Sequence, residues 1–278
     1  MKKIGFIGQG FIGENLADNF QKRGYLDIVR YDLDKYKDNK LKIAECDIVF
    51  VAVPTPTTPE GFDGSILEAV LKIPRDFSTV VIKSTLPPKL MRKLEKDNPE
   101  LFLMHCPEFL SEDTAQHDTD FPERNILGIS NMYDESLRSK AKEILDILPA
   151  APYSKFCTFE ESTLVKYIGN CFFVVKNMYF NMIHDLAKEY NCKWPRLHEM
   201  ILADSRIHSV HTNPIHKSGR GAGGHCLIKD FAALSDIYKD VDDPLGQGLF
   251  LYNEEKNIKY LKESKKDLDL LKGGYGKY

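Results

Sequence analysis

The sequence lacks any Cys-x-x-Cys pair, although its 278 residues include six cysteines. These lie far apart in the chain, at Cys46, Cys106, Cys157, Cys171, Cys192 and Cys226. Their scatter argues against a zinc ribbon and against a disulfide framework, and it favours a reducing compartment, the cytoplasm. A long apolar run is also missing, because Gly8, Gly10 and Glu14 interrupt the apolar N-terminal stretch. We therefore expect neither a signal peptide nor a membrane-spanning helix.

An excess of charge of either sign is absent as well. The formal net charge is -3, which gives no electrostatic argument for a nucleic-acid partner or a membrane surface. Hydrophobic residues make up 42% of the chain, a proportion that is ordinary for a globular protein with a real core. We therefore expect a globular protein whose partner is a small molecule.

Short apolar runs alternate with helical stretches over the first half of the chain. Strands are expected at 3–7, 27–31, 47–53, 79–82, 101–104 and 125–129, and a helix at 11–23. This alternation predicts a Rossmann-type, doubly wound parallel sheet in a domain of residues 1–157. Ligands of such sheets bind beyond the carboxyl ends of the strands, where Thr55, Thr85 and Glu108 are expected.

A different pattern begins after Pro149–Pro152. Residues 160–190 read as one long helix, with apolar residues at three- and four-residue spacing and others on the remaining faces. Such a helix packs against its own domain and against a second subunit, so a homodimer through 160–190 is expected. A core helix in a monomer is the alternative. The second domain, 158–278, is predicted to be all-helical.

A dinucleotide-binding fingerprint opens the chain at Gly8–Gly13. The glycines at 8, 10 and 13 follow the first expected strand and open a helix, and Asp32 ends the next strand. In that context Gly8 makes the tight turn, Gly10 admits a pyrophosphate at the helix start, and Gly13 allows close helix packing. Asp32 can bind the ribose 2′-hydroxyl and would repel a 2′-phosphate, so the cofactor expected is NAD. A glycine turn without ligand is the alternative.

The stretch Gly223–Asp230 places Cys226 directly after a glycine turn, with Lys229 and Asp230 just beyond. A thiolate favoured by a cation or a helix start can attack a bound carbonyl. A nucleophilic thiol together with a hydride acceptor suggests oxidation through an aldehyde to an acid. The competing interpretation of Cys226 is a small core residue.

Six motifs in order along the chain resemble the UDP-glucose/GDP-mannose dehydrogenase family. They are Val53–Pro56 (V-P-T-P), Lys83–Pro87 (K-S-T-L-P), Pro107–Glu112 (P-E-F-L-S-E), Glu161 with Lys166 and Asn170, Asp204–Ile207 (D-S-R-I) and Gly223–Asp230. The resemblance implies NAD-dependent oxidation of the primary alcohol of a nucleotide sugar, above all UDP-glucose, to a uronic acid with two NAD. In this family the acid commonly feeds polysaccharide synthesis.

The resemblance also implies a role for each matching residue. Cys226 would hold the aldehyde as a thiohemiacetal and then a thioester, with Lys166 and Asn170 at the oxyanion and Asp230 assisting proton transfer. Further catalytic roles fall to Thr85 and Glu108. The implied cofactor contacts are Gly8, Gly10, Phe11, Ile12, Gly13, Asp32, Val53, Thr55, Thr85 and Glu112. The implied substrate contacts are Glu108, Phe109, Leu110, Lys166, Asn170, Arg206 and Gly223, with Arg206 reaching the sugar of a neighbouring subunit.

The chain departs from the family pattern in several places. The family carries a third domain that closes over the nucleotide and would begin at Tyr278, so this chain is expected to be a short form. The family also usually has a longer insertion at the place where this chain has only Leu33–Glu45. Four residues differ from the family pattern: Cys106 and Ala222 directly before two of the motifs, and His225 and Ile228 within the last motif. These departures leave open which nucleotide sugar is used and whether a partner chain completes the site.

Two further hypotheses concern histidines. His208, His211, His216 and His225 could be imagined as a metal site, but their spacing fits no closed site, so a substrate-facing loop and no metal are expected. His225 could favour the Cys226 thiolate when protonated. The alternatives for function are a two-electron hydroxyacid or sugar-acid dehydrogenase, which needs no thiol, and a non-catalytic relative that binds NAD or a nucleotide sugar.

Overall fold

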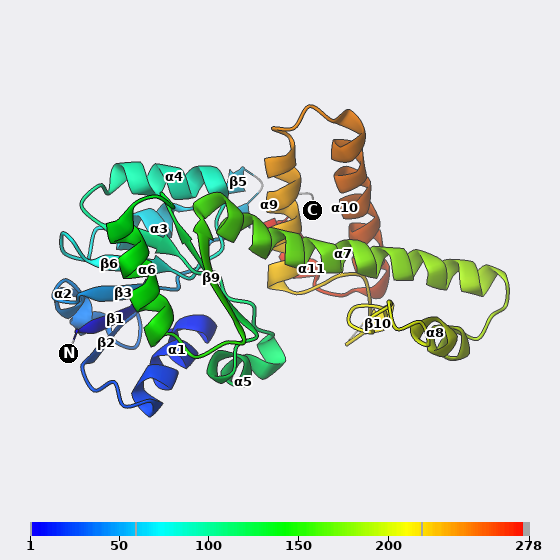
Figure 1. Ribbon diagram of the computed structural model, residues 1–278. Coiled ribbons are helices and arrows are strands. Elements are labelled where there is room, and N and C mark those ends of the chain that lie inside the picture. Colours follow the sequence, from blue (N-terminus) through cyan, green and yellow to red (C-terminus); the bar gives the residue numbers. More distant parts are fainter. Residues whose placement is uncertain (1, 59, 218, 275–278) are drawn as a thin grey trace. The chain divides into compact units, whose positions relative to one another are not determined.

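The computed structural model describes residues 2–58, 60–217 and 219–274 (Figure 1). Contacts within the chain divide it into two compact units. The first comprises Met1–Thr55 and Asp63–Lys166, and the second comprises Pro56–Phe62 and Tyr167–Tyr278. The long helix that begins in the first unit therefore continues into the second.

Seven strands of the described residues form one sheet in the first unit, in the order β2-β1-β3-β6-β7-β8-β9. The strands are β1 (Ile4–Ile7), β2 (Ile28–Tyr31), β3 (Ile48–Val51), β6 (Thr79–Ile82), β7 (Phe102–His105), β8 (Arg124–Ile129) and β9 (Tyr153–Thr158). The first five are mutually parallel, as predicted, but β8 runs antiparallel to β7, and β9 is parallel to β8. The sheet is therefore mixed at this end rather than wholly parallel.

Helices cover both faces of this sheet, so strands such as β3 and β6 are buried along their whole length. The helices are α1 (Phe11–Lys22), α2 (Lys40–Ile43), α3 (Ser65–Val70), α4 (Pro88–Asp97), α5 (Ala115–Asp120) and α6 (Glu135–Ile147), with 3-10 turns η1 (Lys37–Asn39) and η2 (Glu112–Thr114). Burial on both faces explains why these strands read as continuous apolar runs. The Rossmann-type fold expected from the sequence is confirmed.

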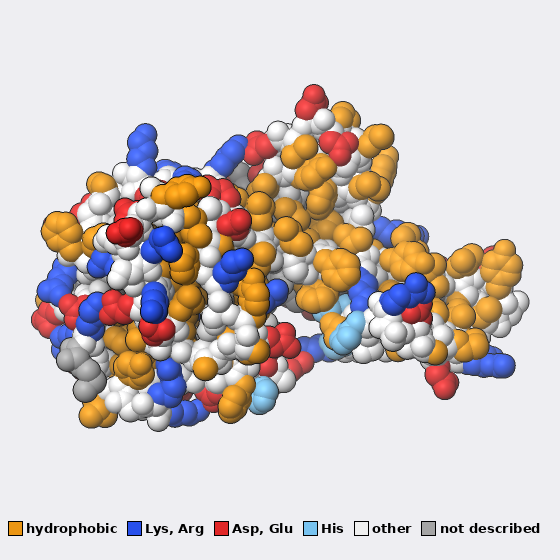
Figure 2. Space-filling model, in the orientation of Figure 1, with side chains coloured by type: hydrophobic (Ala, Val, Ile, Leu, Met, Phe, Trp, Pro, Cys, Tyr) orange, Lys and Arg blue, Asp and Glu red, His pale blue; other side chains and the backbone are white. Residues whose placement is uncertain are grey.

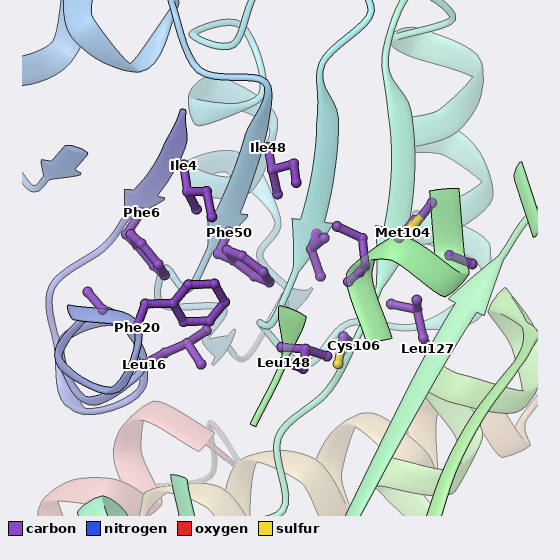
Figure 3. Packing of buried hydrophobic residues seen from close by; sticks show 14 of the residues in the cluster. Ile4, Phe6, Leu16, Phe20, Ile48, Phe50, Met104, Cys106, Leu127 and Leu148 are labelled. Atoms are coloured by element: carbon purple, nitrogen blue, oxygen red, sulfur yellow. The ribbon is translucent and has the colours of Figure 1, made fainter. Parts of the chain in front are cut away.

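The main core lies between the sheet and helices α1 and α6. Phe6 of β1, Phe50 of β3 and Phe20 of α1 meet there with ring centroids 5.4 Å apart in each pair (Figure 3). Three large aromatic side chains in mutual contact fix α1 against the two central strands. This contact sets the position of the glycine turn that joins β1 to α1.

Strand β1 lies between β2 on one side and β3 on the other. The chain leaves β1, forms β2, and then returns across β1 to form β3. The strand order therefore reverses at this point, and the crevice beyond the carboxyl ends of β1 and β3 is the position where open α/β sheets bind ligands.

The second unit is mainly helical, whereas the sequence predicted an all-helical domain: two short hairpins that the sequence did not indicate accompany its helices. Its helices are α7 (Phe159–Glu189, starting in the first unit), α8 (Trp194–Leu202), α9 (His225–Tyr238), α10 (Pro244–Ser264) and α11 (Leu268–Gly274). The hairpins pair β4 (Thr57–Thr58) with β5 (Gly61–Phe62), and β10 (Ile215–His216) with β11 (Gly219–Arg220).

Helices α7, α9 and α10 share a small core. Cys171, Val174 and Met178 of α7 pack with Phe231 of α9 and Tyr260 of α10. Helix α10 lies beside α9 after a short turn (Figure 1). No helix in the described part of the chain has the length and apolarity that a bilayer crossing requires.

Candidate active site

The glycine turn between β1 and α1 has the geometry of a phosphate-binding loop. Gly8 has a φ of 87°, and a Cβ there would collide with the carbonyl oxygen of Ala52. A Cβ at Gly13 would collide with the Gly8 carbonyl. Gly10 precedes the first helical residue, Phe11, and nothing lies within 4 Å of where its Cβ would be. The helix start is therefore open to a ligand, with backbone N–H groups and a dipole that favour an anion.

Asp32 and Gln9 lie beside this turn. Asp32 accepts hydrogen bonds from the backbone N–H of Gln9 at 2.7 Å and of Asp34 at 3.2 Å. These bonds, the first above all, lower the pKa of Asp32, so its carboxylate is charged. The Gln9 side-chain oxygen is buried and has no hydrogen-bond partner among the described residues. An unpaired buried acceptor and a fixed carboxylate next to an open helix start fit the hydroxyl and phosphate groups of NAD.

The ends of β3 and β6 are tied together by side-chain hydrogen bonds. The backbone N–H of Val53 donates to the Ser84 hydroxyl at 3.0 Å, and the Thr55 hydroxyl donates to the Thr85 carbonyl at 2.8 Å. Thr55 is buried and Thr85 is half-buried. The structure thus places Val53, Thr55 and Thr85 at one place on the carboxyl edge of the sheet.

Glu108 and Lys166 form a buried ion pair at 3.2 Å, with side chains 11% and 6% exposed. The second carboxylate oxygen of Glu108 accepts the backbone N–H of Leu110 at 2.9 Å, and the Lys166 ammonium lies 5.7 Å from the Phe109 ring centroid. Such additional partners offset part of the cost of burying an ion pair. Glu108, Phe109, Leu110 and Lys166 are thus brought together as one cluster around this ion pair.

A neighbouring histidine is neutral. His105 ends β7, is fully buried, and lies 2.9 Å from the Ser162 hydroxyl and 3.3 Å from the Ser84 carbonyl. Burial, and secondarily the nearby cations Lys83 and Lys166, lower the pKa of His105 to about 3. At neutral pH His105 therefore adds no positive charge to this part of the unit.

A cavity of about 220 Å³ lies in the first unit along this cluster. Its lining includes Ile12 of α1 and the segment Pro107–Ser111, with Lys83 and Arg124 as cations. Lys83, for which the sequence indicated no role, is only 8% exposed and has its ammonium 3.4 Å from the Cys106 sulfur. The sequence signal that could have identified Lys83 as a site residue is its position directly after a strand that is buried along its whole length. Glu112 begins η2, and its side chain lies outside the described part of the structure.

The second unit holds the cysteine loop. Gly224 has a φ of 85° and precedes α9, so Cys226 is the second residue of a 14-residue helix, and its side chain is exposed. The first turn of a helix has unpaired backbone N–H groups and a positive dipole end, which favour a thiolate. His225, also exposed, precedes it as the first helical residue.

Asp230 follows Cys226 by one helical turn and is only 1% exposed. It accepts the side-chain amide of Asn170 at 2.6 Å and the Lys229 ammonium at 2.6 Å. An amide nitrogen carries two hydrogens, so this contact leaves Asn170 a second donor. A buried, charge-paired carboxylate one turn from an exposed thiol is a combination that acyl-transfer chemistry uses.

Arg206 and the histidine-containing loop, two features singled out in the sequence, lie in other parts of the second unit than the cysteine loop. Arg206 is 87% exposed and pairs with Asp204 at 2.6 Å. His211 stacks on Phe173 with centroids 4.6 Å apart, and Lys176 donates to the backbone carbonyl of His208. Within residues 2–58, 60–217 and 219–274, no three His, Cys, Asp or Glu side chains are grouped as metal ligands.

A Rossmann-type unit with an open glycine turn, followed by a helical unit, is the architecture of a dinucleotide-dependent dehydrogenase. Comparison with known families gives the same class and narrows it. Residues 30–146 match the NAD binding domain of the UDP-glucose/GDP-mannose dehydrogenase family, and residues 160–249 match the central domain of that family. The chain belongs to this family.

Individual relatives agree with this assignment. The chain is 28% identical to a UDP-glucose 6-dehydrogenase of Streptococcus pneumoniae, over 87% of this chain and 70% of the relative. It is 30% identical to one of Rhizobium meliloti, over 75% of this chain but only 49% of the relative. The match thus spans between 49% and 70% of the length of these two relatives.

Solved structures share the fold. A UDP-D-ManNAc dehydrogenase from Pyrococcus horikoshii superposes with a TM-score of 0.76 at 21% identity, over 92% of this chain and 68% of that one. A 3-hydroxyisobutyrate dehydrogenase from Mycobacterium tuberculosis superposes with a TM-score of 0.73 at 18% identity, over 97% of both chains.

Proposed function

We propose that the protein oxidises the primary alcohol of a nucleotide sugar, UDP-glucose in the first instance, to the uronic acid with two NAD. The observation that carries this proposal is the exposed Cys226 at the start of α9, one turn from the buried Asp230. Family membership supports it. Residues 1–157 are assigned to cofactor binding and residues 158–278 to the catalytic cysteine and to dimerisation.

The first unit would hold NAD, which when bound accepts the hydrides of both oxidations. Gly10 and the α1 start would receive the pyrophosphate, and Asp32 the ribose hydroxyls. Val53, Thr55 and Thr85 would line the nicotinamide end at the carboxyl edge of the sheet. The acceptor oxygen of Gln9 and the charged Asp32 are the features of this chain that suit such a ligand.

The second unit would hold the carbon that is oxidised. The first oxidation converts the alcohol to an aldehyde, and Asp230 accepts the hydroxyl proton through a water. The Cys226 thiolate then forms a C–S bond to the aldehyde carbon, and the resulting thiohemiacetal loses a second hydride to give a thioester. The family resemblance assigns the stabilisation of the oxyanions to Lys166 and Asn170, and assistance of the attacking water to Glu108. Hydrolysis of the thioester by this water gives the acid and returns the thiol.

Counting NADH per acid tests this function directly. Purified protein with excess NAD and UDP-glucose is expected to release two NADH for each uronic acid formed. One NADH with a stable carbonyl product would instead support a two-electron hydroxyacid or sugar-acid dehydrogenase. If the protein binds NAD but turns over none of a panel of nucleotide sugars, the result would support a non-catalytic binding protein.

We also infer a homodimer through α7. One side of the helix packs into its own unit, while the opposite side exposes an apolar stripe at spacings of three and four residues. The stripe consists of Ile168, Phe172, Val175, Tyr179, Met182 and Leu186 of α7 and Tyr190 directly after it, each between 43% and 73% exposed. Figure 2 shows hydrophobic side chains gathered along this helix. A continuous apolar stripe on one helix suits a two-fold interface in which each copy presents the same face.

Replacing Tyr179 by glutamate is expected to turn the dimer into a monomer, because a charge would be buried twice at a two-fold contact. Sedimentation or light scattering measures the mass. Leu26→Glu is the matched control, since Leu26 is 85% exposed on the first unit, outside the stripe. A Tyr179→Glu protein that stays dimeric, or a wild-type monomer, would refute this interface.

A further inference from the structure

Three of the four residues in the loop Gly221–Gly224 are glycines, yet the loop presents Cys226 in a defined position. Glycine has the greatest backbone freedom of any residue, so such a loop is held only by contacts from outside itself. In the second unit those contacts come from a segment more than thirty residues further along the chain. None of the predicted site residues lies in that segment.

Asn257 of α10 provides the first contact. Its side-chain oxygen accepts the backbone N–H of Ala222 at 2.8 Å, and its side-chain nitrogen donates to the Ala222 carbonyl at 2.9 Å. Asn257 is completely buried, and Ala222 is 4% exposed. One amide side chain therefore satisfies both backbone groups of a buried loop residue, as a neighbouring strand would.

The turn after α10 provides the other two contacts. The Lys266 ammonium donates to the Gly221 carbonyl at 2.9 Å, and Lys266 is only 5% exposed. The Asp267 carboxylate accepts the backbone N–H of Gly224 at 2.8 Å. Both Lys265 and Asp267 have left-handed φ values, 54° and 52°, which is costly for residues with a Cβ. The turn is held in this costly conformation while its side chains reach the loop.

The packing at Gly223 shows how close this approach is. A Cβ at Gly223 would collide with the Asp267 carboxylate and the Lys266 side chain. Glycine at this position is therefore needed for contact with the turn, in addition to any approach of substrate. Gly224, which Asp267 holds, is two residues before Cys226 and immediately precedes α9.

We propose that Asn257, Lys266 and Asp267 form a clasp that positions the Gly221–Gly224 loop and thereby sets the Cys226 thiol at the start of α9. The clasp residues are positioning residues: they act on the reaction through the loop backbone. This inference rests on the proposed role of Cys226 as nucleophile. Displacing a reacting group by about 1 Å costs as much as a hundredfold in rate, so fixing a glycine loop has a direct kinetic consequence.

Asp267 is the position to test, because its contact lies nearest the thiol. Asp267→Ala is expected to lower kcat about ten- to a hundredfold while the KM for NAD stays within twofold. The alkylation rate of Cys226 by iodoacetamide at neutral pH, followed on the Cys226 peptide by mass spectrometry, should fall at least threefold. Asp267→Asn should restore both values towards wild type, because its amide oxygen can accept the same hydrogen bond.

Asp269→Ala is the matched control, since it removes the same charge two residues away on α11 and should leave both readouts unchanged. If Asp267→Ala does not fold, Asp267→Glu keeps the charge, displaces the acceptor by one methylene and should give the same slow alkylation. Wild-type alkylation and kcat in Asp267→Ala, or an Asn variant no better than Ala, would overturn the clasp. Alkylation needs no substrate, so it reports on the clasp even if a Cys226→Ser protein proves active and the proposed function fails.

Discussion

Replacing Cys226 by serine is expected to abolish formation of the acid, with a loss of kcat on the order of a thousandfold or more. The start of α9 favours the ionised form of a thiol, which is a strong nucleophile, whereas a serine hydroxyl at the same place is far less acidic and stays protonated. Without a covalent hold, an aldehyde made in the first oxidation is not carried to the thioester. Formation of acid and of NADH are measured together.

The matched control is Cys192→Ser. Cys192 is the other exposed cysteine, and it lies in the turn after α7. This variant should keep the wild-type kcat and the ratio of two NADH per acid. A Cys226→Ser protein that still makes acid with two NADH would exclude the thioester route. One that makes NADH at the wild-type rate with a stable carbonyl product would assign the chain to two-electron oxidation.

Replacing each of two glycines in the β1–α1 turn by alanine is expected to have different effects on the stability of the first unit. Gly13→Ala should destabilise the first unit by about 3 kcal/mol or more, because the new Cβ would strike the Gly8 carbonyl, a backbone atom that cannot rotate away. Gly10→Ala should leave stability nearly unchanged, because Gly10 has an ordinary φ of -84° and open space where the Cβ would be. Thermal or urea unfolding measures this difference.

The same Gly10→Ala variant should bind NAD about tenfold or more weakly, a loss of about 1.4 kcal/mol, because the methyl group takes the space intended for the pyrophosphate. Titration of NAD by calorimetry gives the affinity. Gly10→Ala thus isolates ligand binding from folding, which Gly13→Ala cannot do. Unchanged NAD affinity in Gly10→Ala would mean that the pyrophosphate lies elsewhere, and a stable Gly13→Ala protein would mean that α1 can move away from the turn.

The central strands could be predicted from the sequence because helices bury both of their faces. Strands β3 and β6 consist of isoleucine, valine, phenylalanine and threonine, a composition that allows few other structures. Strand β9 was missed for the opposite reason. It lies at the edge of the sheet with β8 as its one neighbour, and its residues Tyr153–Thr158 are exposed or only half-buried, so no apolar run marks it.

The residues of the candidate site that lie close together in short sequence motifs could be predicted from the sequence. Cys226 and Asp230 share one helix, and their four-residue spacing already places them on one face. The partners of the cysteine loop could not be found in this way, because Asn257 and Asp267 meet it through contacts that span 35 and 43 residues. Such contacts depend on how α9 and α10 pack, which no local pattern encodes.

The six cysteines lie within the described ranges, and they differ sharply in exposure. Burial raises the pKa of Cys46 and of Cys157 to about 11, and raises that of Cys171 further, while Cys106 is 1% exposed. At neutral pH a thiol reagent therefore meets Cys192 and Cys226 first. In a Cys192→Ser background, a single maleimide dye would label the start of α9 and report by fluorescence whenever a ligand enters. The same exposure makes Cys226 an early target of peroxide, so stocks stored in air would lose activity before they lose structure.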